Sequence, residues 1–499
     1  MLFRNTVAQT SGVAVGYIFS FLLAPLMLSK LGLDKFGVWA VTGAFATYAG
    51  LLDLGVGRSL IRFVAVFQAE GDVKRMRQSL GLGLLSVTVV GLIALAIVAS
   101  LAHVIAEQFG VLDGEEMRWV LIASVLIYSC NGYIGVINAL GLGTRQMVPP
   151  NIAIVVGACL NFAISVATLL STSSLVAYAF ANALAAALSM IPAYVAMRRV
   201  GHGPYFSMPT RSLTRQILSF SVKDQVGWIA DLVNFQTDKI IIAFAVDIKA
   251  AAVYEIASRV VLGVRGIAIM TVSAMIPTAA AAIASEGRGV VKGMYRRYTL
   301  RSCSVAFPLF VVAAATSPFL LIFWLNEAPG DSELLVPFLT LAYMFNMTTG
   351  VGSTISLAAG HPGVVSLNSV LIAILNLIFT LALAPVLGIW GVVGGTFAAL
   401  LLGSIWFNWR FIRLFELTAA DYIAGVLPTG ALALGLAIPP AVISILVGSP
   451  DGRLEAAFWL MLTSAMFVIP YWYLATRWDL LPGKMRLPRV VQTRQTEEA

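Results

Sequence analysis

Ionisable residues recur within two apolar runs of this chain, residues 217–246 and 252–284. The set comprises Lys223, Asp224, Asp231, Asp238, Lys239, Glu255, Arg259 and Arg265. In hydrocarbon each such side chain costs on the order of 3 kcal/mol by insertion scales, so proteins keep it where it pairs, faces water or binds a polar ligand. The cations could therefore hold an anionic group, whereas the carboxylates could neutralise the cations or bind a coupling ion.

The spacing of these residues indicates which of them share one face of a helix. Asp224, Asp231 and Asp238 are separated by seven residues, nearly two helical turns, so they fall close to one face of a helix. Glu255 and Arg259 are four residues apart and can pair within one helix. The sequence therefore predicts one helix with a polar stripe, followed by a helix that carries an internal ion pair.

Other charges extend this constellation. Arg265 is rotated by roughly 120° from Arg259 at 100° per residue. Nearer the start of the chain, Asp53 lies deep in an apolar run, and Arg58 and Arg62 follow about one turn apart. Two interpretations stay open at this point. The charges either neutralise one another as packing pairs between helices, or they line a hydrated cavity.

The composition places these residues in a membrane protein. The chain has 499 residues, of which 59% are hydrophobic and only 11% are charged, whereas a soluble domain is about 25% charged. Apolar runs near 20 residues, long enough to cross a bilayer, recur from end to end. We predict an all-α polytopic membrane protein with about 14 transmembrane helices. We find no nucleotide-binding loop, hydrolase elbow or metal-ligand spacing, so we expect no enzyme, no metal and no cofactor.

The distribution of basic residues supports an even number of spans. With the N-terminus inside, about 23 of the Lys and Arg residues fall on one face and about 5 on the other, as the positive-inside rule requires. Both termini are therefore expected in the cytoplasm. The net charge of +8 reflects this orientation and does not indicate nucleic-acid binding.

The two halves of the chain also repeat at an offset near 216 residues. For example, Asn161 in the first half parallels Asn376 in the second. This offset predicts two parallel six-helix lobes, residues 1–205 and 206–418, and transporters commonly bind substrate between such halves. Residues 419–476 are expected to add two further spans, and residues 477–499 to form a basic cytoplasmic tail.

Several motifs resemble one family of exporters. They are LGLDKFGVW at residues 31–39, LDLGVG at 52–57, AEGD at 69–72, TDKIII at 237–242, VYEIA at 253–257, and GHP at 360–362 with Asn368 and Asn376. They look like polysaccharide-export (Wzx-like) flippases of the multidrug/oligosaccharidyl-lipid/polysaccharide exporter (MOP) superfamily. The resemblance implies 14 spans, two lobes in a V and alternating access.

The resemblance also implies a substrate, an undecaprenyl-pyrophosphate-linked oligosaccharide moved from the cytoplasmic to the outer leaflet for surface polysaccharide or lipopolysaccharide biosynthesis. The expected substrate-binding residues are Arg58, Arg62, Lys223, Lys239, Arg259 and Arg265. The expected coupling or charge-pairing residues are Asp53, Asp224, Asp231, Asp238 and Glu255. The related lipid II flippases place arginines in the first span, whereas the first cation here is Arg4, which disfavours lipid II as cargo.

The expected partners are membrane lipids, a polysaccharide polymerase and glycosyltransferases, with protons or Na⁺ as the coupling ion. The alternative function is a cation-coupled multidrug antiporter of the same superfamily. Such antiporters usually have twelve spans, so the last two spans favour the flippase. A membrane glycosyltransferase or polymerase is a third class, but no loop here is long enough for a catalytic domain.

Overall fold

The computed structural model describes residues 2–53, 55–200, 206–273 and 275–481. Their regular structure is entirely helical, with seventeen α-helices and two short 3₁₀ helices. The helices are α1 (Leu2–Ala49), η1 (Gly50–Asp53), α2 (Val56–Glu70), α3 (Val73–Phe109), α4 (Gly114–Gly143), α5 (Val148–Ser171), α6 (Leu175–Val200), α7 (Arg211–Ala245), α8 (Ile248–Ser273), α9 (Ile276–Glu286), η2 (Arg288–Val290), α10 (Val291–Ala315), α11 (Ser317–Leu325), α12 (Ser332–Met347), α13 (Gly350–Ala358), α14 (Pro362–Leu387), α15 (Ile389–Leu414), α16 (Ala419–Val447) and α17 (Arg453–Arg477).

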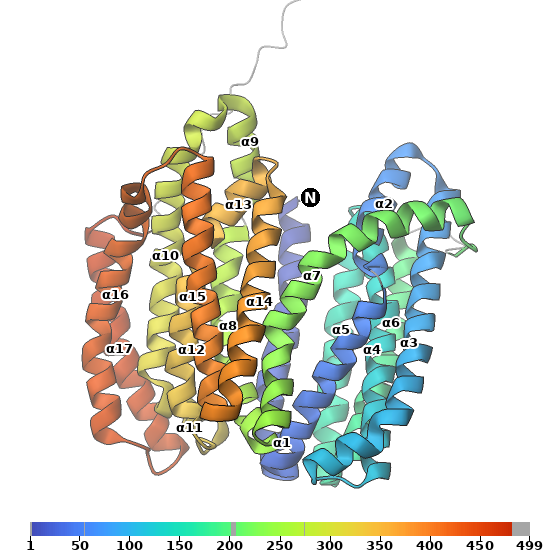
Figure 1. Cartoon of the computed structure of the whole chain (residues 1–499), viewed down its shortest axis with the longest axis horizontal. Coiled ribbons are helices and arrows are strands. Elements are labelled where there is room, and N and C mark those ends of the chain that lie inside the picture. Colours follow the sequence, from blue (N-terminus) through green and yellow to red (C-terminus); the bar gives the residue numbers. More distant parts are fainter. Residues whose placement is uncertain (1, 54, 201–205, 274, 482–499) are drawn as a thin grey trace, which may run out of the picture.

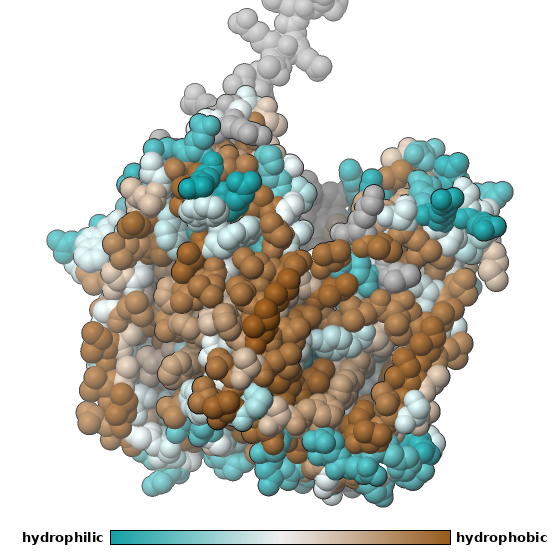
Figure 2. Space-filling model, in the orientation of Figure 1, coloured by the Kyte–Doolittle hydropathy of each residue, from teal (hydrophilic) through white to brown (hydrophobic). Residues whose placement is uncertain are grey.

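The helices form two bundles that meet at one end and diverge at the other (Figure 1). One bundle contains α1–α6, and the other is built around α8, α10, α12, α14 and α15. Helices α16 and α17 pack on the outer side of the second bundle, against α10 and α11. Apolar side chains cover most of the visible face, and hydrophilic ones gather at its two ends (Figure 2). This banding is the pattern expected of a protein that crosses a bilayer.

Within the described residues, eleven helical segments are long and apolar enough to cross a membrane, fewer than the predicted 14. Residues Val15–Asp53 count as one segment, although the chain bends within it at Gly32. Helices α7 and α8 are not among the eleven. Both helices carry several of the ionisable residues described above.

The bend in α1 depends on glycine. Gly32 has φ 82° and ψ 168°, a conformation that side chains with a Cβ rarely adopt. It turns the chain at the end of the molecule where the bundles meet (Figure 1). Five residues later, a Cβ added to Gly37 would lie 2.3 Å from the carbonyl oxygen of Ile248, at the start of α8. The two bundles therefore touch backbone to backbone at this point.

Polar and aromatic contacts complete this closed end. Lys249 Nζ lies 3.7 Å from Asp34 Oδ2. The Trp324 indole of α11 donates a 2.8 Å hydrogen bond to the carbonyl of Phe21 and stacks on its ring, with the centroids 3.9 Å apart. The part of α1 before the bend is thus fixed to α11, and the part after it to the start of α8.

Helix α7 contacts both bundles. Its first half packs on the N-terminal bundle, where Ser221 Oγ donates to Ser59 Oγ at 2.7 Å and Gln225 Nε2 donates to the carbonyl of Leu51 at 2.8 Å. Its second half packs against α14 in the other bundle, where Asn234 Nδ2 lies 3.4 Å from the carbonyl of Ser369. Figure 1 shows α7 running diagonally between the two bundles. The predicted lobe boundary at residue 206 therefore falls before a helix that belongs to both.

Candidate functional site

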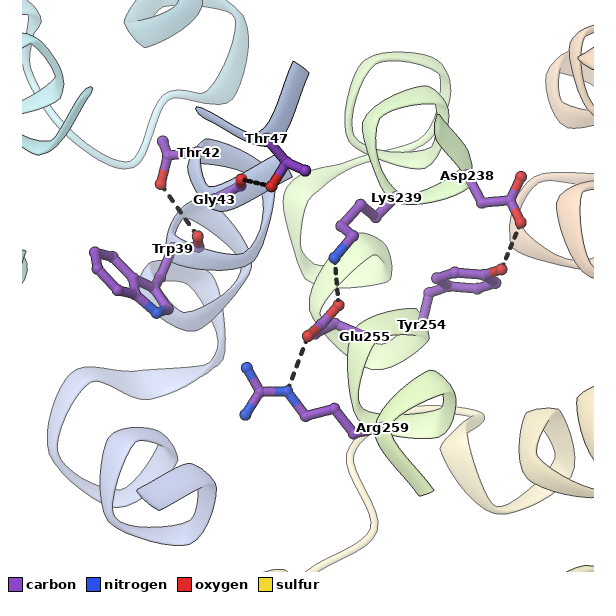
Figure 3. A network of polar contacts seen from close by, with 9 residues as sticks. All are labelled: Trp39, Thr42, Gly43, Thr47, Asp238, Lys239, Tyr254, Glu255 and Arg259. Carbon is purple, nitrogen blue, oxygen red and sulfur yellow. Dashed lines mark hydrogen bonds and ion pairs between the residues drawn. The ribbon is translucent and has the colours of Figure 1, made fainter. Parts of the chain in front are cut away.

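Three ionisable side chains meet between α7 and α8 (Figure 3). Lys239 Nζ lies 2.8 Å from Glu255 Oε2, and Arg259 Nε donates to Glu255 Oε1 at 2.8 Å. The side chains are largely buried, with 12%, 13% and 20% of their surfaces exposed for Lys239, Glu255 and Arg259. The Glu255–Arg259 pair within one helix agrees with the prediction from their spacing. The sequence did not predict that Lys239 joins them from α7.

This cluster has two cations and one carboxylate. Its net charge is therefore positive, and the Coulomb interaction with an anion strengthens in an environment of low dielectric constant. Two further contacts orient Arg259, because its Nη1 lies 3.3 Å from the carbonyl oxygen of Ser20 and its guanidinium lies 5.1 Å from the Phe36 ring. Both contacts come from α1, so Arg259 joins the two bundles.

The three side chains line a cavity of about 660 Å³, here called the central cavity. Its walls come from α1, α7, α8 and α12, and they are otherwise largely apolar and aromatic. Tyr17, Phe21, Phe235 and Tyr343 supply the aromatic surface. Cavities of about 300–1,000 Å³ with a few convergent polar groups are typical of ligand sites.

A second cavity, here called the N-terminal cavity, has a volume of about 520 Å³ and lies among α1, α4, α5 and α6. Among apolar side chains, its lining includes polar ones, principally those of Asn131, Asn138, Asn161, Asn182 and Ser189. Arg259 lines both this cavity and the central one. A ligand that contacts Arg259 can therefore extend into either space.

A third cavity of about 310 Å³, here called the C-terminal cavity, lies among α7, α8, α12, α14 and α15. Asp231 and Arg265 line it. The Arg265 guanidinium lies 4.9 Å from the Phe235 ring and 5.7 Å from the Tyr343 ring, a cation–π arrangement that is stronger when desolvated. Arg265 and Arg259 thus line different cavities, as their predicted 120° separation implies.

Asp238, on α7, points toward Tyr254 of α8 (Figure 3). Only 2% of the residue is exposed. One oxygen, Oδ2, accepts hydrogen bonds from Tyr254 Oη at 2.6 Å and Thr396 Oγ1 at 2.8 Å. The other oxygen, Oδ1, is buried and has no hydrogen-bond partner among the described residues. A buried carboxylate without a compensating cation carries a large desolvation cost, so this position can bind a proton or a small cation.

The structure separates Asp53 and Arg62 from this cluster. Asp53 Oδ2 accepts from the Gly57 amide at 2.9 Å, and its Oδ1 accepts from Ser86 Oγ, so Asp53 stabilises the start of α2. Arg62 is exposed, and its guanidinium lies 4.0 Å from the Phe220 ring. Neither residue lines one of the three cavities described above.

Three further predicted site residues cannot be placed in this way. The side chains of Arg58, Lys223 and Asp224 lie outside the described part of the structure. Their assignment to substrate binding or charge pairing stays a prediction.

The candidate site residues predicted from the sequence are all charged. The asparagines of the N-terminal cavity were therefore missed, because their side-chain amides are neutral. The repeat offered the relevant clue. Asn161 donates to Asn182 Oδ1 at 3.0 Å between α5 and α6, and Asn376 donates to Thr396 Oγ1 at 3.0 Å between α14 and α15. The matched asparagines thus make corresponding contacts in the two halves.

An all-helical protein with polar cavities within and between two bundles has an architecture found among secondary transporters. Comparison with known proteins specifies the class. A sequence model of the family described as "Polysaccharide biosynthesis protein" matches residues 2–282. The chain belongs to this family. No curated protein sequence matches the chain.

Solved structures share the fold. The inward closed conformation of the lipid II flippase MurJ superposes with a TM-score of 0.69 at 12% identity, covering 95% of this chain and 98% of that one. An inward-facing multidrug resistance MATE family transporter of the MOP superfamily superposes with a TM-score of 0.64 at 17% identity, covering 81% of this chain and 96% of that one. At these identities the likeness establishes the fold, whereas function depends on the site.

Proposed function

We propose that this protein is a flippase that moves an undecaprenyl-pyrophosphate-linked oligosaccharide from the cytoplasmic to the outer leaflet of the bacterial inner membrane. Membership of the polysaccharide biosynthesis family supports this proposal. The observation that carries it is the excess of positive charge around Glu255, where Lys239 and Arg259 share one carboxylate. A pyrophosphate requires such cations, while its lipid tail can remain in the bilayer.

The proposed topology has 14 spans with both termini in the cytoplasm. The bent α1 supplies two of the spans, and α7 and α8 supply one each. The lobes are residues 1–205 and 206–418, followed by two extra spans within residues 419–476 and a cytoplasmic tail, residues 477–499. The ends at which the bundles diverge face the cytoplasm, and the contact between Gly37 and Ile248 closes the outer side.

Transport follows alternating access. The lipid headgroup enters the central cavity from the cytoplasmic side, and the lobes then exchange their open and closed ends around it. Asp231 and Asp238 are the proposed coupling residues, and protons or Na⁺ are the coupling ions. We expect the Asp238→Asn variant to lose transport driven by an ion gradient. It should keep transport of the lipid-linked glycan down the glycan's own concentration gradient. Transport by this variant that still follows an imposed ion gradient would contradict the assignment of Asp238.

The proposed partners, a polysaccharide polymerase and glycosyltransferases, supply and consume the lipid-linked glycan. They follow from the substrate class. Co-purification from native membranes tests them, and the absence of any such enzyme from the purified material would argue against a stable complex.

The decisive experiment measures flipping by purified protein in proteoliposomes that contain a fluorescent undecaprenyl-pyrophosphate oligosaccharide. Arg259→Gln leaves Lys239 and Glu255 as a neutral pair and is expected to lower the flipping rate at least tenfold, a transition-state cost of about 1.4 kcal/mol. Arg413→Gln is the matched control, because Arg413 is exposed and stacks on Trp409 outside the cavities. Equal rates in Arg259→Gln and wild type would overturn the proposal.

A multidrug antiporter is the second candidate, and the aromatic wall of the central cavity with Glu255 favours it, since lipophilic cations bind to such surfaces. The same assay discriminates the two functions. Efflux of a lipophilic cation driven by an ion gradient, without flipping of the lipid-linked glycan, would establish the antiporter. The positive charge of the Lys239–Glu255–Arg259 cluster opposes this outcome.

A further inference from the structure

The N-terminal cavity differs chemically from the space beside it. Apart from Arg259 at its boundary, none of its lining residues is acidic or basic. The C-terminal cavity is smaller and includes both Asp231 and Arg265. Arg259 therefore has the N-terminal cavity, whose lining is otherwise uncharged, on one side, and Lys239 and Glu255 in the central cavity on the other.

The polar groups of the N-terminal cavity are not all used by the fold. Asn138 Oδ1 is buried and has no hydrogen-bond partner among the described residues. By contrast, Asn161 and Asn182 bond to each other, and Ser189 donates to the carbonyl of Ala185 at 2.7 Å. A buried amide without a partner costs roughly 1–3 kcal/mol, and a polar ligand that bonds to it removes this cost.

The N-terminal cavity also carries an aromatic surface. Trp39 and Tyr178 line it and meet edge to face, with ring centroids 5.1 Å apart. Asparagine side chains both donate and accept hydrogen bonds, which matches the hydroxyl and acetamido groups of a sugar. Aromatic rings complement the apolar face of a pyranose. A volume of about 520 Å³ is within the range of small-ligand sites, about 300–1,000 Å³.

We propose that the N-terminal cavity binds the sugar nearest the pyrophosphate of the lipid-linked glycan, and that this sugar is uncharged. This inference rests on the proposed flippase function. Arg259 fixes the arrangement, because it lines both cavities. The phosphates contact Arg259 and Lys239, and the first sugar lies beyond Arg259 among the asparagines. The lipid tail leaves past the exposed apolar residues Ile18 and Ile267 at the rim of the central cavity.

The sugar is inferred to be neutral because Arg259 is the one cation among the described residues that line the N-terminal cavity. A sugar carboxylate there would be desolvated without a partner, because the phosphates already occupy Arg259. Burying an unpaired charge is far more costly than burying a hydroxyl that finds an amide. The cavity therefore selects a hexose or an N-acetylhexosamine over a uronic acid at this position.

The test compares the affinities of three lipids for purified protein in lipid nanodiscs. The probes are undecaprenyl pyrophosphate, its conjugate with one N-acetylglucosamine, and its conjugate with one glucuronic acid. For wild type we expect the neutral sugar to tighten Kd about tenfold over the sugar-free lipid. The glucuronic acid conjugate should bind no better than the sugar-free lipid.

The test variant replaces two asparagines of the N-terminal cavity with leucine. Asn131→Leu with Asn138→Leu should abolish the tenfold gain, while Kd for undecaprenyl pyrophosphate stays unchanged and so confirms that the protein is folded. Asn346→Leu, in the C-terminal cavity, is the matched control and should keep the gain.

Three results would overturn the inference. They are a wild-type affinity that does not depend on the sugar, a gain that survives in the double variant, and equal affinities for the neutral and acidic conjugates. In each case binding of the sugar-free lipid leaves the flippase proposal intact. Failure of wild type to bind any of the three lipids would overturn both.

Discussion

At the scale of single residues, Glu255 is the residue on which the ion cluster depends. It accepts from Lys239 and Arg259 through different oxygens. Removing one cation leaves Glu255 paired with the other, whereas removing the carboxylate leaves two adjacent cations without a counter-ion. Breaking a buried ion pair from one side is strongly destabilising because a charge remains uncompensated. The three positions should therefore respond unequally to substitution.

Glu255→Gln is expected to lower the free energy of unfolding by about 3 kcal/mol, and Lys239→Met by about 1 kcal/mol. Thermal unfolding in detergent, followed by tryptophan fluorescence, measures both. The double variant, Glu255→Gln with Lys239→Met, should regain part of the loss because only one cation then remains. Equal losses in the two single variants would contradict the unequal roles of Glu255 and Lys239.

Sequence reasoning succeeded where the signal was local. The spacing of Glu255 and Arg259 predicted their pairing, because residues four apart on a helix are neighbours. It could not reveal that Lys239 reaches Glu255 from another helix, since this contact depends on how α7 and α8 pack. It also missed Asn131 and Asn138, because an uncharged amide inside a membrane helix costs less than a charge and does not stand out in composition.

At the scale of elements, α7 is the segment that sequence periodicity described least well. A run of apolar residues predicts a span but not the bundle against which that span packs. Helix α7 contacts both bundles, through Gln225 on one side and Asn234 on the other.

The contact between α1 and α8 leads to a prediction about the closed end. A methyl group at Gly37 would lie 2.3 Å from the Ile248 carbonyl oxygen, so Gly37→Ala strains the closed arrangement. Gly43 lies on the same helix, and a methyl group added there would have no neighbour within 4 Å, so Gly43→Ala is the matched control. We expect Gly37→Ala to shift the protein toward states in which the outer side is open.

A cysteine at Ser20, which lines both the central and N-terminal cavities, can report this shift. In a background without Cys130, Cys159 and Cys303, Ser20→Cys should react slowly with an impermeant thiol reagent added outside intact cells. Adding Gly37→Ala should raise this rate at least fivefold, about 1 kcal/mol in the opening equilibrium. The Gly43→Ala version should retain the slow rate. An unchanged rate in Gly37→Ala would show that this contact does not close the outer side.

At the scale of the whole molecule, the number of crossings decides how the cavities face the two compartments. Eleven segments meet the criteria of length and composition, and the proposed topology has 14. The two counts differ in the bend of α1 and in α7 and α8. The 3.7 Å pair between Asp34 and Lys249 places the α1 bend next to the α7–α8 turn. If both turns lie outside, α1 crosses twice and α7 and α8 cross once each.

Labels at both ends of the chain and at two turns between helices discriminate these topologies. Fourteen crossings place the N-terminus and the end of α17 on the same side, whereas an odd count of eleven places them on opposite sides. Asp247 in the α7–α8 turn is exposed. Fourteen crossings place Asp247 and Glu416 on opposite sides of the membrane, whereas eleven place them on the same side. Fusions of green fluorescent protein to each end should both fluoresce, and Asp247→Cys in the cysteine-free background should react with an impermeant reagent added outside. Glu416→Cys, between α15 and α16, should react only after permeabilisation. A dark fusion at either end, a protected Asp247→Cys, or a Glu416→Cys that reacts in intact cells would contradict fourteen spans and, with them, the placement of the Lys239–Glu255–Arg259 cluster within the membrane.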